Sequence, residues 1–113
     1  MPYILTNMTT TNFTFNDTAI TVYQNGLEET ITFNGKSVSQ KNTLFGTRHE
    51  FVIENDNYEV ITAFDYASRW DNKVQFRKNG KLLEEKRAQA SLLTQTIAII
   101  ILLAVTFLLI KLF

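Results

Sequence analysis

The chain has a single histidine, His49, and no cysteine. Acid–base or nucleophilic catalysis needs a nucleophile beside a base or a pair of carboxylates, and a transition-metal site needs several converging ligands. His49 alternates with Phe51 and Ile53, which predicts a position on the buried face of a strand, while Glu50 and Glu54 fall on the solvent side. No glycine-rich phosphate loop is present. We therefore expect no catalytic residue, no metal site, no cofactor and no enzymatic activity.

Binding chemistry is better represented than catalytic chemistry. Residues 64–73, FDYASRWDNK, bring Tyr66, Arg69 and Trp70 into one expected connection between strands. Tyr, Arg and Trp are the residue types that most often anchor protein interfaces, so these three are candidate partner-binding residues. The alternative is that the only tryptophan belongs to the core of a small sandwich.

The elements that must position these residues are strands. Asn-Gly pairs at 25–26, 34–35 and 79–80 are typical of hairpin turns. Apolar residues alternate with polar ones on both sides of these pairs, with many β-branched and aromatic side chains. Gly46 has no Asn partner and indicates a bulge or a bend. The pattern predicts an all-β domain over residues 1–82, a small antiparallel sandwich or half-open barrel of about seven strands.

The C-terminal part of the sequence is different in kind. Residues 92–110 carry no charge and would form a helix about 28 Å long, close to the thickness of the bilayer hydrocarbon. Residues 97–105 are apolar on every side, whereas a surface helix of a globular domain has one polar face. We therefore expect a transmembrane α-helix over 92–113, preceded by a basic, helical juxtamembrane segment at 83–91. Thr94, Gln95 and Ala98 are candidate contacts with another helix inside the bilayer.

Charge is balanced overall, with eleven Lys and Arg against eleven Asp and Glu, so nucleic acid is not an expected partner. The distribution is uneven, because residues 1–72 have a net charge of −5 and residues 73–87 a net charge of +4. Cations are retained on the cytoplasmic side of a membrane. Lys78, Lys81, Lys86 and Arg87 before the helix, against Lys111 after it, predict a single-pass, tail-anchored protein with its N-terminus in the cytoplasm and its C-terminus outside.

One signal favours the opposite orientation. Asn7, Asn12 and Asn16 each begin an Asn-X-Thr triplet, which would be a glycosylation site in an extracellular domain. The region is rich in Asn and Thr, and the N-terminus lacks the basic and apolar segments of a secretory signal. We therefore prefer the cytoplasmic orientation.

Half of the chain resembles a known family. The matching residues are Gly35-Lys36, Val38, Lys41, Leu44, Gly46, Phe51, Ile53 and Asn79-Gly80-Lys81. They follow the strand repeat of Fas apoptosis inhibitory molecule domains, with its GK opening, its F-x-V-like strand and its late NGK turn. The resemblance implies an all-β, non-enzymatic, protein-binding domain, and no functional residue is carried over from it. That family is soluble, so the apolar tail is a departure from it.

Together these observations predict a non-enzymatic, membrane-anchored accessory subunit or adaptor of a membrane protein complex. Its partners would be the lipid bilayer and other membrane proteins. The alternative is a membrane-tethered ligand-binding or sensory β module, which would hold a lipid or small molecule.

Overall fold

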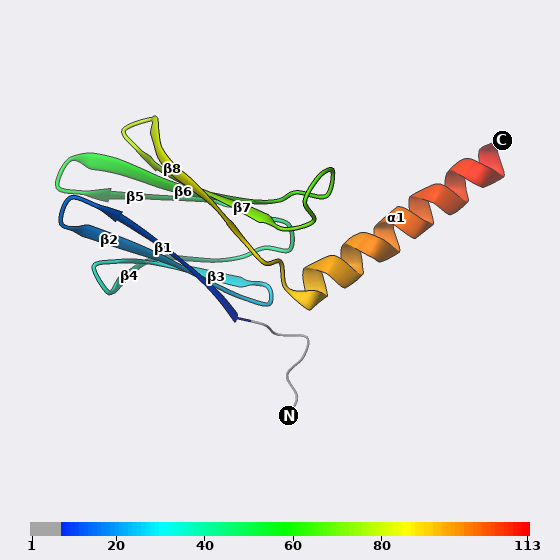
Figure 1. Ribbon diagram of the computed structural model, residues 1–113, viewed down its shortest axis with the longest axis horizontal. Coiled ribbons are helices and arrows are strands. Elements are labelled where there is room, and N and C mark those ends of the chain that lie inside the picture. The colour runs from blue at the N-terminus through cyan, green and yellow to red at the C-terminus, as the bar shows by residue number, and fades with distance from the viewer. Residues whose placement is uncertain (1–7) are drawn as a thin grey trace, which may run out of the picture.

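A computed structural model describes residues 8–113 and shows a two-layer β-sandwich from which one long helix projects (Figure 1). Each layer is a four-stranded antiparallel meander, β1-β2-β3-β4 in one and β5-β6-β7-β8 in the other. The elements are β1 (Met8–Phe15), β2 (Thr18–Asn25), β3 (Glu28–Phe33), β4 (Lys36–Asn42), β5 (Arg48–Ile53), β6 (Asp56–Phe64), β7 (Asn72–Lys78), β8 (Lys81–Ala88) and α1 (Leu92–Leu112). The expected all-β domain followed by one C-terminal helix is confirmed.

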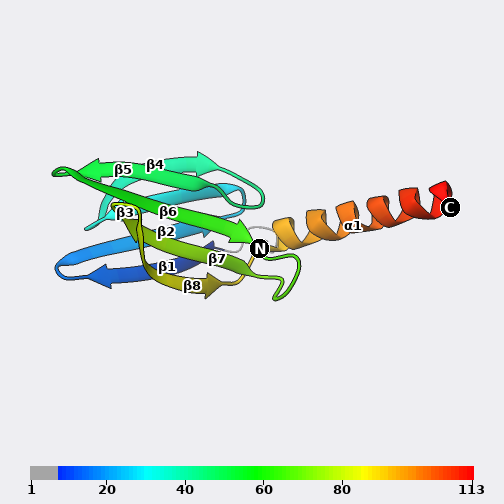
Figure 2. The ribbon, with the colours of Figure 1, turned by 90° about the horizontal axis from the view of Figure 1, so that it is seen from above.

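The chain crosses between the layers once, at residues 43–47. At the two sides of the sandwich β4 contacts β5 and β1 contacts β8, so the open edges of the sheets lie against each other (Figure 2). Thr9 Oγ1, for example, donates a hydrogen bond to the backbone carbonyl of Gln89 at 3.2 Å. Covering both edges in this way removes the free strand edges through which β proteins aggregate.

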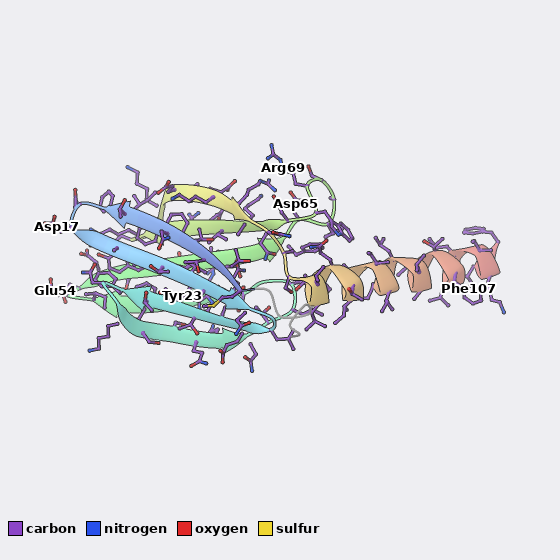
Figure 3. All side chains as sticks on the ribbon, turned by 60° about the horizontal axis from the view of Figure 1, so that its bottom comes forward. Asp17, Tyr23, Glu54, Asp65, Arg69 and Phe107 are labelled. Atoms are coloured by element: carbon purple, nitrogen blue, oxygen red, sulfur yellow. The ribbon has the colours of Figure 1, made fainter. Side chains whose placement is uncertain are left out.

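Two of the predicted Asn-Gly turns have the backbone geometry that the dipeptide favours. Asn34 and Gly35, and likewise Asn79 and Gly80, have positive φ angles at both positions, as a type I′ turn requires. These turns connect β3 to β4 and β7 to β8. They lie at the end of the sandwich far from the helix, where Asp17 and Glu54 also lie (Figure 3).

The apolar core fills the space between the sheets. It contains inward-facing residues of both layers, and the aromatic rings of Phe33, Phe51, Tyr58 and Phe76 pack in contact, with centroid separations of 5.3 to 6.2 Å. The buried members are Phe13, Ile20, Val22, Ile31, Phe51, Tyr58, Val60, Val74, Phe76 and Ala88. The period-two alternation in the sequence therefore identified the core face of most strands.

One expectation about the elements is wrong. Residues 83–88 belong to strand β8 and are not helical, because β8 pairs along its length with β7 and tertiary pairing outweighs the local helix propensity. The structure has eight strands in its described part, close to the expected number of about seven, and β4 is the strand that the alternation does not predict. Val38 is the only apolar residue of that strand, so it shows no alternation. Of the three Asn-X-Thr triplets, the first begins at Asn7, which lies outside the described residues.

Candidate functional site

The helix is attached firmly to one end of the sandwich. Ser91 caps it, its Oγ accepting from the backbone N–H of Thr94 at 3.1 Å. Thr94 Oγ1 donates to the carbonyl of Leu44 at 3.0 Å, and Gln95 Nε2 donates to the carbonyl of Ala90 at 2.9 Å. Thr94 is 3% and Ala98 7% exposed. The first two turns of α1 are thus part of the β domain.

This attachment corrects the expected role of Thr94 and Ala98 as contacts for a second helix. Both side chains are covered by their own β domain and have little surface left for another chain. Gln95 is half-buried, and its amide is engaged with Ala90. The small and polar residues at the start of the helix serve to fasten it to the domain.

Residues 43–47 form the first of two loops around the helix. Phe64 N–H donates to the carbonyl of Phe45 at 2.7 Å, and Thr62 N–H donates to that of Thr47 at 2.9 Å, so this loop continues alongside β6. Gly46 has φ +122°, and a Cβ atom there would lie 2.1 Å from the carbonyl oxygen of Thr62. Only glycine fits this close approach, which places the ring of Phe45 beside Phe64, with centroids 6.0 Å apart.

Residues 65–71 form the second loop, and it holds Trp70 in an unusual conformation. Trp70 has φ +59°, which is rare and strained for a bulky side chain. Its N–H donates to the carbonyl of Asp65 at 2.8 Å, and Asp65 N–H donates to the carbonyl of Asp71 at 2.7 Å. The indole ring packs edge-on against Phe64, with centroids 5.0 Å apart. The loop hydrogen bonds thus fix the tryptophan between the sandwich and the helix.

An ion pair closes the base of this second loop. Arg87 Nη1 donates to Asp65 Oδ2 at 2.9 Å and to Asp71 Oδ1 at 2.7 Å. The hydrogen bond from Arg87 lowers the pKa of the Asp65 carboxyl below its ordinary range, and the hydrogen bonds to Asp65 and Asp71 raise the pKa of the Arg87 guanidinium. Arg87 therefore acts as a clamp on the loop that carries Trp70.

Between the two loops and the helix lies an apolar pocket with a volume of about 350 Å³. This volume is at the lower end of the range of about 300 to 1,000 Å³ that small-molecule sites occupy. No charged side chain is among its lining residues, which are Phe45, Phe64, Tyr66, Trp70, Ala98, Ile101 and Leu102. The pocket is open on one side, where it continues into the exposed surface of α1.

The three candidate binding residues therefore have separate roles. Trp70 is half-buried against Phe64 and the helix, which agrees in part with both the interface and the core interpretation. Tyr66 is 72% exposed and stands at the rim of the pocket. Arg69 is exposed and extends from the loop into the surroundings (Figure 3). Only Tyr66 and Trp70 share the pocket.

The expected group of membrane-surface cations is not one group in space. Lys81 begins β8 and Ala88 ends it, so at about 3.4 Å per residue Lys81 is roughly 24 Å from the helix end of the strand. Lys78, which pairs with Lys81 across the turn, is held at the same far end by Asp56 at 3.7 Å. The assignment of Lys78 and Lys81 to the membrane surface is therefore wrong, because an extended strand carries them away from the helix.

The remaining expected cations have different positions. Lys86 lies nearer the helix, over the ring of Phe13, and donates to the carbonyl of Asn12. Arg87 is occupied by the two aspartates of the clamp. Lys111 is in the last turn of α1, over the ring of Phe107 at 5.5 Å. Of the expected cations before the helix, Lys86 and Arg87 are the ones near it.

A buried polar network lies inside the sandwich at the helix end. Glu29 is 4% exposed, and its carboxylate accepts from Thr62 Oγ1 at 2.8 and 2.9 Å and from Gln24 Nε2 at 3.0 Å. His49, fully buried, has Nε2 at 2.9 Å from Glu29 Oε1 and Nδ1 at 2.8 Å from Ser39 Oγ. Because several donors converge on it, the buried carboxylate is well satisfied.

The order Ser39, His49, Glu29 is that of a nucleophile, a base and an orienting acid. In a hydrolase triad the imidazole must meet both the nucleophile and the leaving group of a substrate. Here His49 has no exposed surface, and Glu29 holds Thr62 and Gln24 as well as the imidazole. The arrangement is better suited to joining β2, β3, β4, β5 and β6 through hydrogen bonds than to turning over a substrate.

The alternation in the sequence predicts His49 on a buried face but does not predict the hydrogen-bonding network around it. The signal was available, because Glu29 is two residues before Ile31 and Thr62 is two residues after Val60, each in phase with the core. A polar residue in phase with the core requires a buried partner. Phe45, Ile101 and Leu102 of the apolar pocket were also missed, since only the tertiary structure brings the two loops to the helix.

Comparison of the chain with protein-family models, with curated proteins and with solved structures gave no match. The resemblance to Fas apoptosis inhibitory molecule domains therefore stays a prediction.

Proposed function

We propose that this protein is a non-enzymatic, single-pass membrane protein that serves as an accessory subunit or adaptor of a membrane protein complex. The observation that carries the proposal is the exposed apolar surface of α1 beyond the β domain. From residue 99 onward the helix is exposed on every side, and its side chains are almost all Ile, Leu, Val and Phe. Such a surface needs lipid or protein around it, since water would not solvate it.

The length of the helix fits a bilayer. α1 is about 31 Å long at 1.5 Å per residue, close to the hydrocarbon thickness of about 30 Å. It has the length and hydropathy of a membrane span, and only 11% of its most apolar stretch is buried against the domain. A helix that served as the core of a soluble domain would be mostly buried.

The proposed orientation places the β domain in the cytoplasm. The segments at the helix end of the sandwich carry Lys41, Arg48, Arg69, Lys73 and Arg87, whereas the other end of α1 carries Lys111. Lys and Arg near a span favour the cytoplasmic side, and acidic residues contribute little to this preference. The support for a cytoplasmic domain therefore comes from cations that the fold gathers at this end, in place of Lys78 and Lys81.

An adaptor role is supported by the rigid joint between domain and helix. The Ser91 cap, the bond from Thr94 to Leu44 and the burial of Ala98 fix the direction in which α1 leaves the sandwich. A domain held in this way presents the same faces to the membrane environment at all times, which lowers the ordering cost of binding a partner.

Chemical crosslinking of the full-length protein in native membranes, followed by detergent extraction, tests the proposal. We expect a discrete crosslinked complex with another membrane protein, and protease protection of a tag placed after Phe113. A chain with residues 99–112 replaced by leucine keeps the contacts of Thr94 and Ala98 and shows whether the partner recognises the sheets or the helix. Recovery of the wild type only as a solitary monomer would refute the adaptor role.

A membrane-tethered ligand-binding module is the second candidate, and the apolar pocket at the joint favours it. Enzymatic activity is the third candidate, and the hydrogen-bonded side chains of Ser39, His49 and Glu29 are the feature that bears on it. A hydrolytic activity of the purified protein that disappears in both Ser39→Ala and His49→Ala would replace the present proposal.

A further inference from the structure

The helix is shorter than a bilayer if only its uncovered part is counted. Residues 99–112 span about 21 Å at 1.5 Å per residue, whereas the hydrocarbon layer is about 30 Å thick. The turns before residue 99 must therefore enter the hydrocarbon as well, and they carry the β domain with them. Ala98, which contacts the domain, would then lie within the apolar layer.

The residues that the domain presents at this level are suited to such an environment. Phe45 is 38% and Tyr66 72% exposed, and Trp70 is half-buried beside them. Tyr and Trp are the side chains that concentrate at the boundary between headgroups and hydrocarbon. The two loops would thus lie in the boundary layer, with the mouth of the apolar pocket facing the lipid tails.

From this geometry we propose that the pocket binds one acyl chain of a bilayer lipid. Its walls are Phe45, Phe64 and Trp70 on the domain side and Ala98, Ile101 and Leu102 on the helix side. The pocket surface is continuous with the exposed apolar surface of the helix, and the medium around that surface in a bilayer is acyl chain. An unfilled apolar hollow at this depth would lose contacts that a lipid tail supplies.

Binding of this kind gives the joint a specific role. The acyl chain would fill the space between the 65–71 loop and the helix, and it would add apolar contacts to the joint that holds the β domain against α1. This inference rests on the membrane span of the proposed function, but it is independent of the adaptor role.

Trp70 is the only tryptophan of the chain, so its fluorescence reports on the pocket alone. The experiment uses the full-length protein in vesicles whose phospholipids carry bromine on the acyl chain, either close to the ester or close to the terminal methyl. Bromine quenches indole on contact. We expect bromine near the ester to remove most of the Trp70 emission and bromine near the methyl to remove much less.

Two double variants separate pocket binding from simple closeness to the membrane. Ile101→Phe with Leu102→Phe adds bulk inside the pocket, whereas Ile100→Phe with Leu103→Phe adds the same bulk at the same depth on other faces of the helix. We expect the first pair to protect Trp70 from quenching and the second to behave as wild type. Native mass spectrometry from detergent should likewise show one retained lipid in the wild type and the second pair, and its loss in the first.

Three outcomes would overturn the inference. If carbonate strips the protein from vesicles, the membrane span itself is wrong and the proposed function fails with it. If the protein resists carbonate but Trp70 is not quenched, or both double variants behave alike, the span stands and the acyl-chain site fails. If Trp70 is shielded while single-cysteine variants at Leu102 crosslink two chains, a second copy occupies the pocket in place of lipid.

Discussion

The two ends of the sandwich distribute polar and apolar side chains in opposite ways. At the end far from the helix the interior is aromatic, with Phe33, Phe51 and Tyr58 in contact, and the turns outside carry charges such as Asp17 and Glu54 (Figure 3). At the helix end many of the buried side chains are polar, and the aromatic rings near the buried Phe64 are half-buried or exposed. There the buried side chains include Gln24, Glu29, His49, Thr62, Ser91 and Thr94, and the exposed rim carries Phe45 and Tyr66.

This difference indicates what surrounds each end. The far end follows the ordinary partition of a protein in water, where burying apolar area is the main source of stability. The helix end gains less from that partition if its surroundings are apolar, so its loops are held instead by hydrogen bonds within the network of Glu29 and by the clamp of Arg87. The apolar helix projects from this same end of the sandwich. The distribution of polar and aromatic side chains there supports a membrane boundary at this position.

The largest effect is expected at Gly46. Its replacement by Ala would place Cβ 2.1 Å from the carbonyl oxygen of Thr62 and 2.6 Å from Ala63 Cα, and these backbone atoms are held by the pairing of residues 45–47 with β6. We expect a loss of more than about 4 kcal/mol in the free energy of unfolding. Denaturation of the full-length protein in detergent micelles, followed by circular dichroism, measures it.

Gly35→Ala is the matched control at the far end. Gly35 has φ +85° but nothing within 4 Å of the added Cβ, so the expected loss is only the left-handed backbone strain of about 1 to 2 kcal/mol. Equal losses at Gly46 and Gly35 would show that the helix end is not packed closely around the crossing loop.

The next largest effect on stability is expected where a buried aromatic ring of the core is removed, and it is compared with the removal of an exposed ring. Phe76 is 1% exposed and packs against Phe13 and Tyr58, so Phe76→Ala should lower the free energy of unfolding by about 3 to 5 kcal/mol. Phe45→Ala, at a ring that is 38% exposed, should cost about 1 kcal/mol. The same denaturation measurement applies, and a cost at Phe45 as large as that at Phe76 would mean that the outer ring is part of the core.

A smaller effect is expected from the polar interior. Glu29→Gln keeps the size of the side chain but replaces one carboxylate oxygen, which accepts from Thr62 or Gln24 and lies near His49 Nε2, by an N–H₂ donor. The expected loss in the free energy of unfolding is about 2 kcal/mol, the worth of a hydrogen bond to a charged group. Glu50→Gln, on the exposed face of β5, should stay within about 0.5 kcal/mol of wild type. If Glu29→Gln leaves the free energy of unfolding unchanged, the network does not stabilise this end of the sandwich.

The smallest expected effect is a local change in the 65–71 loop at acidic pH. Because the hydrogen bond from Arg87 lowers the pKa of Asp65, the clamp favours the folded loop fully above the ordinary carboxyl value of about 3.9 and is lost as the pH falls through the lower, folded value. We expect Trp70 emission to change in that acid window. Asp65→Asn should abolish the change, and Asp17→Asn, at the far end, should leave it. Persistence of the transition in Asp65→Asn would assign it to another group.

The sequence predicted the strands with clear alternation but not all of the sheet. β6 shows the reason for success, because Tyr58, Val60, Thr62 and Phe64 share its buried face as their spacing requires. Strand β4 could not be predicted because Val38 is its only apolar residue. Most of β8 could not be predicted because its residues favour a helix locally. In both strands hydrogen bonding to a neighbour decides the structure, and a single strand does not contain that information.

The sequence by itself determined that an alternating, turn-rich β domain is followed by a helix long and apolar enough for a bilayer, because periodicity and hydropathy are local properties. Only the tertiary structure decided which residues meet at the joint. Residues 81–88 are extended, so Lys78 and Lys81 lie far from the helix, while Phe45 and Trp70, distant in the chain, lie beside Ala98. Such contacts depend on how the strands pair and where the loops close, and these are set by the whole fold.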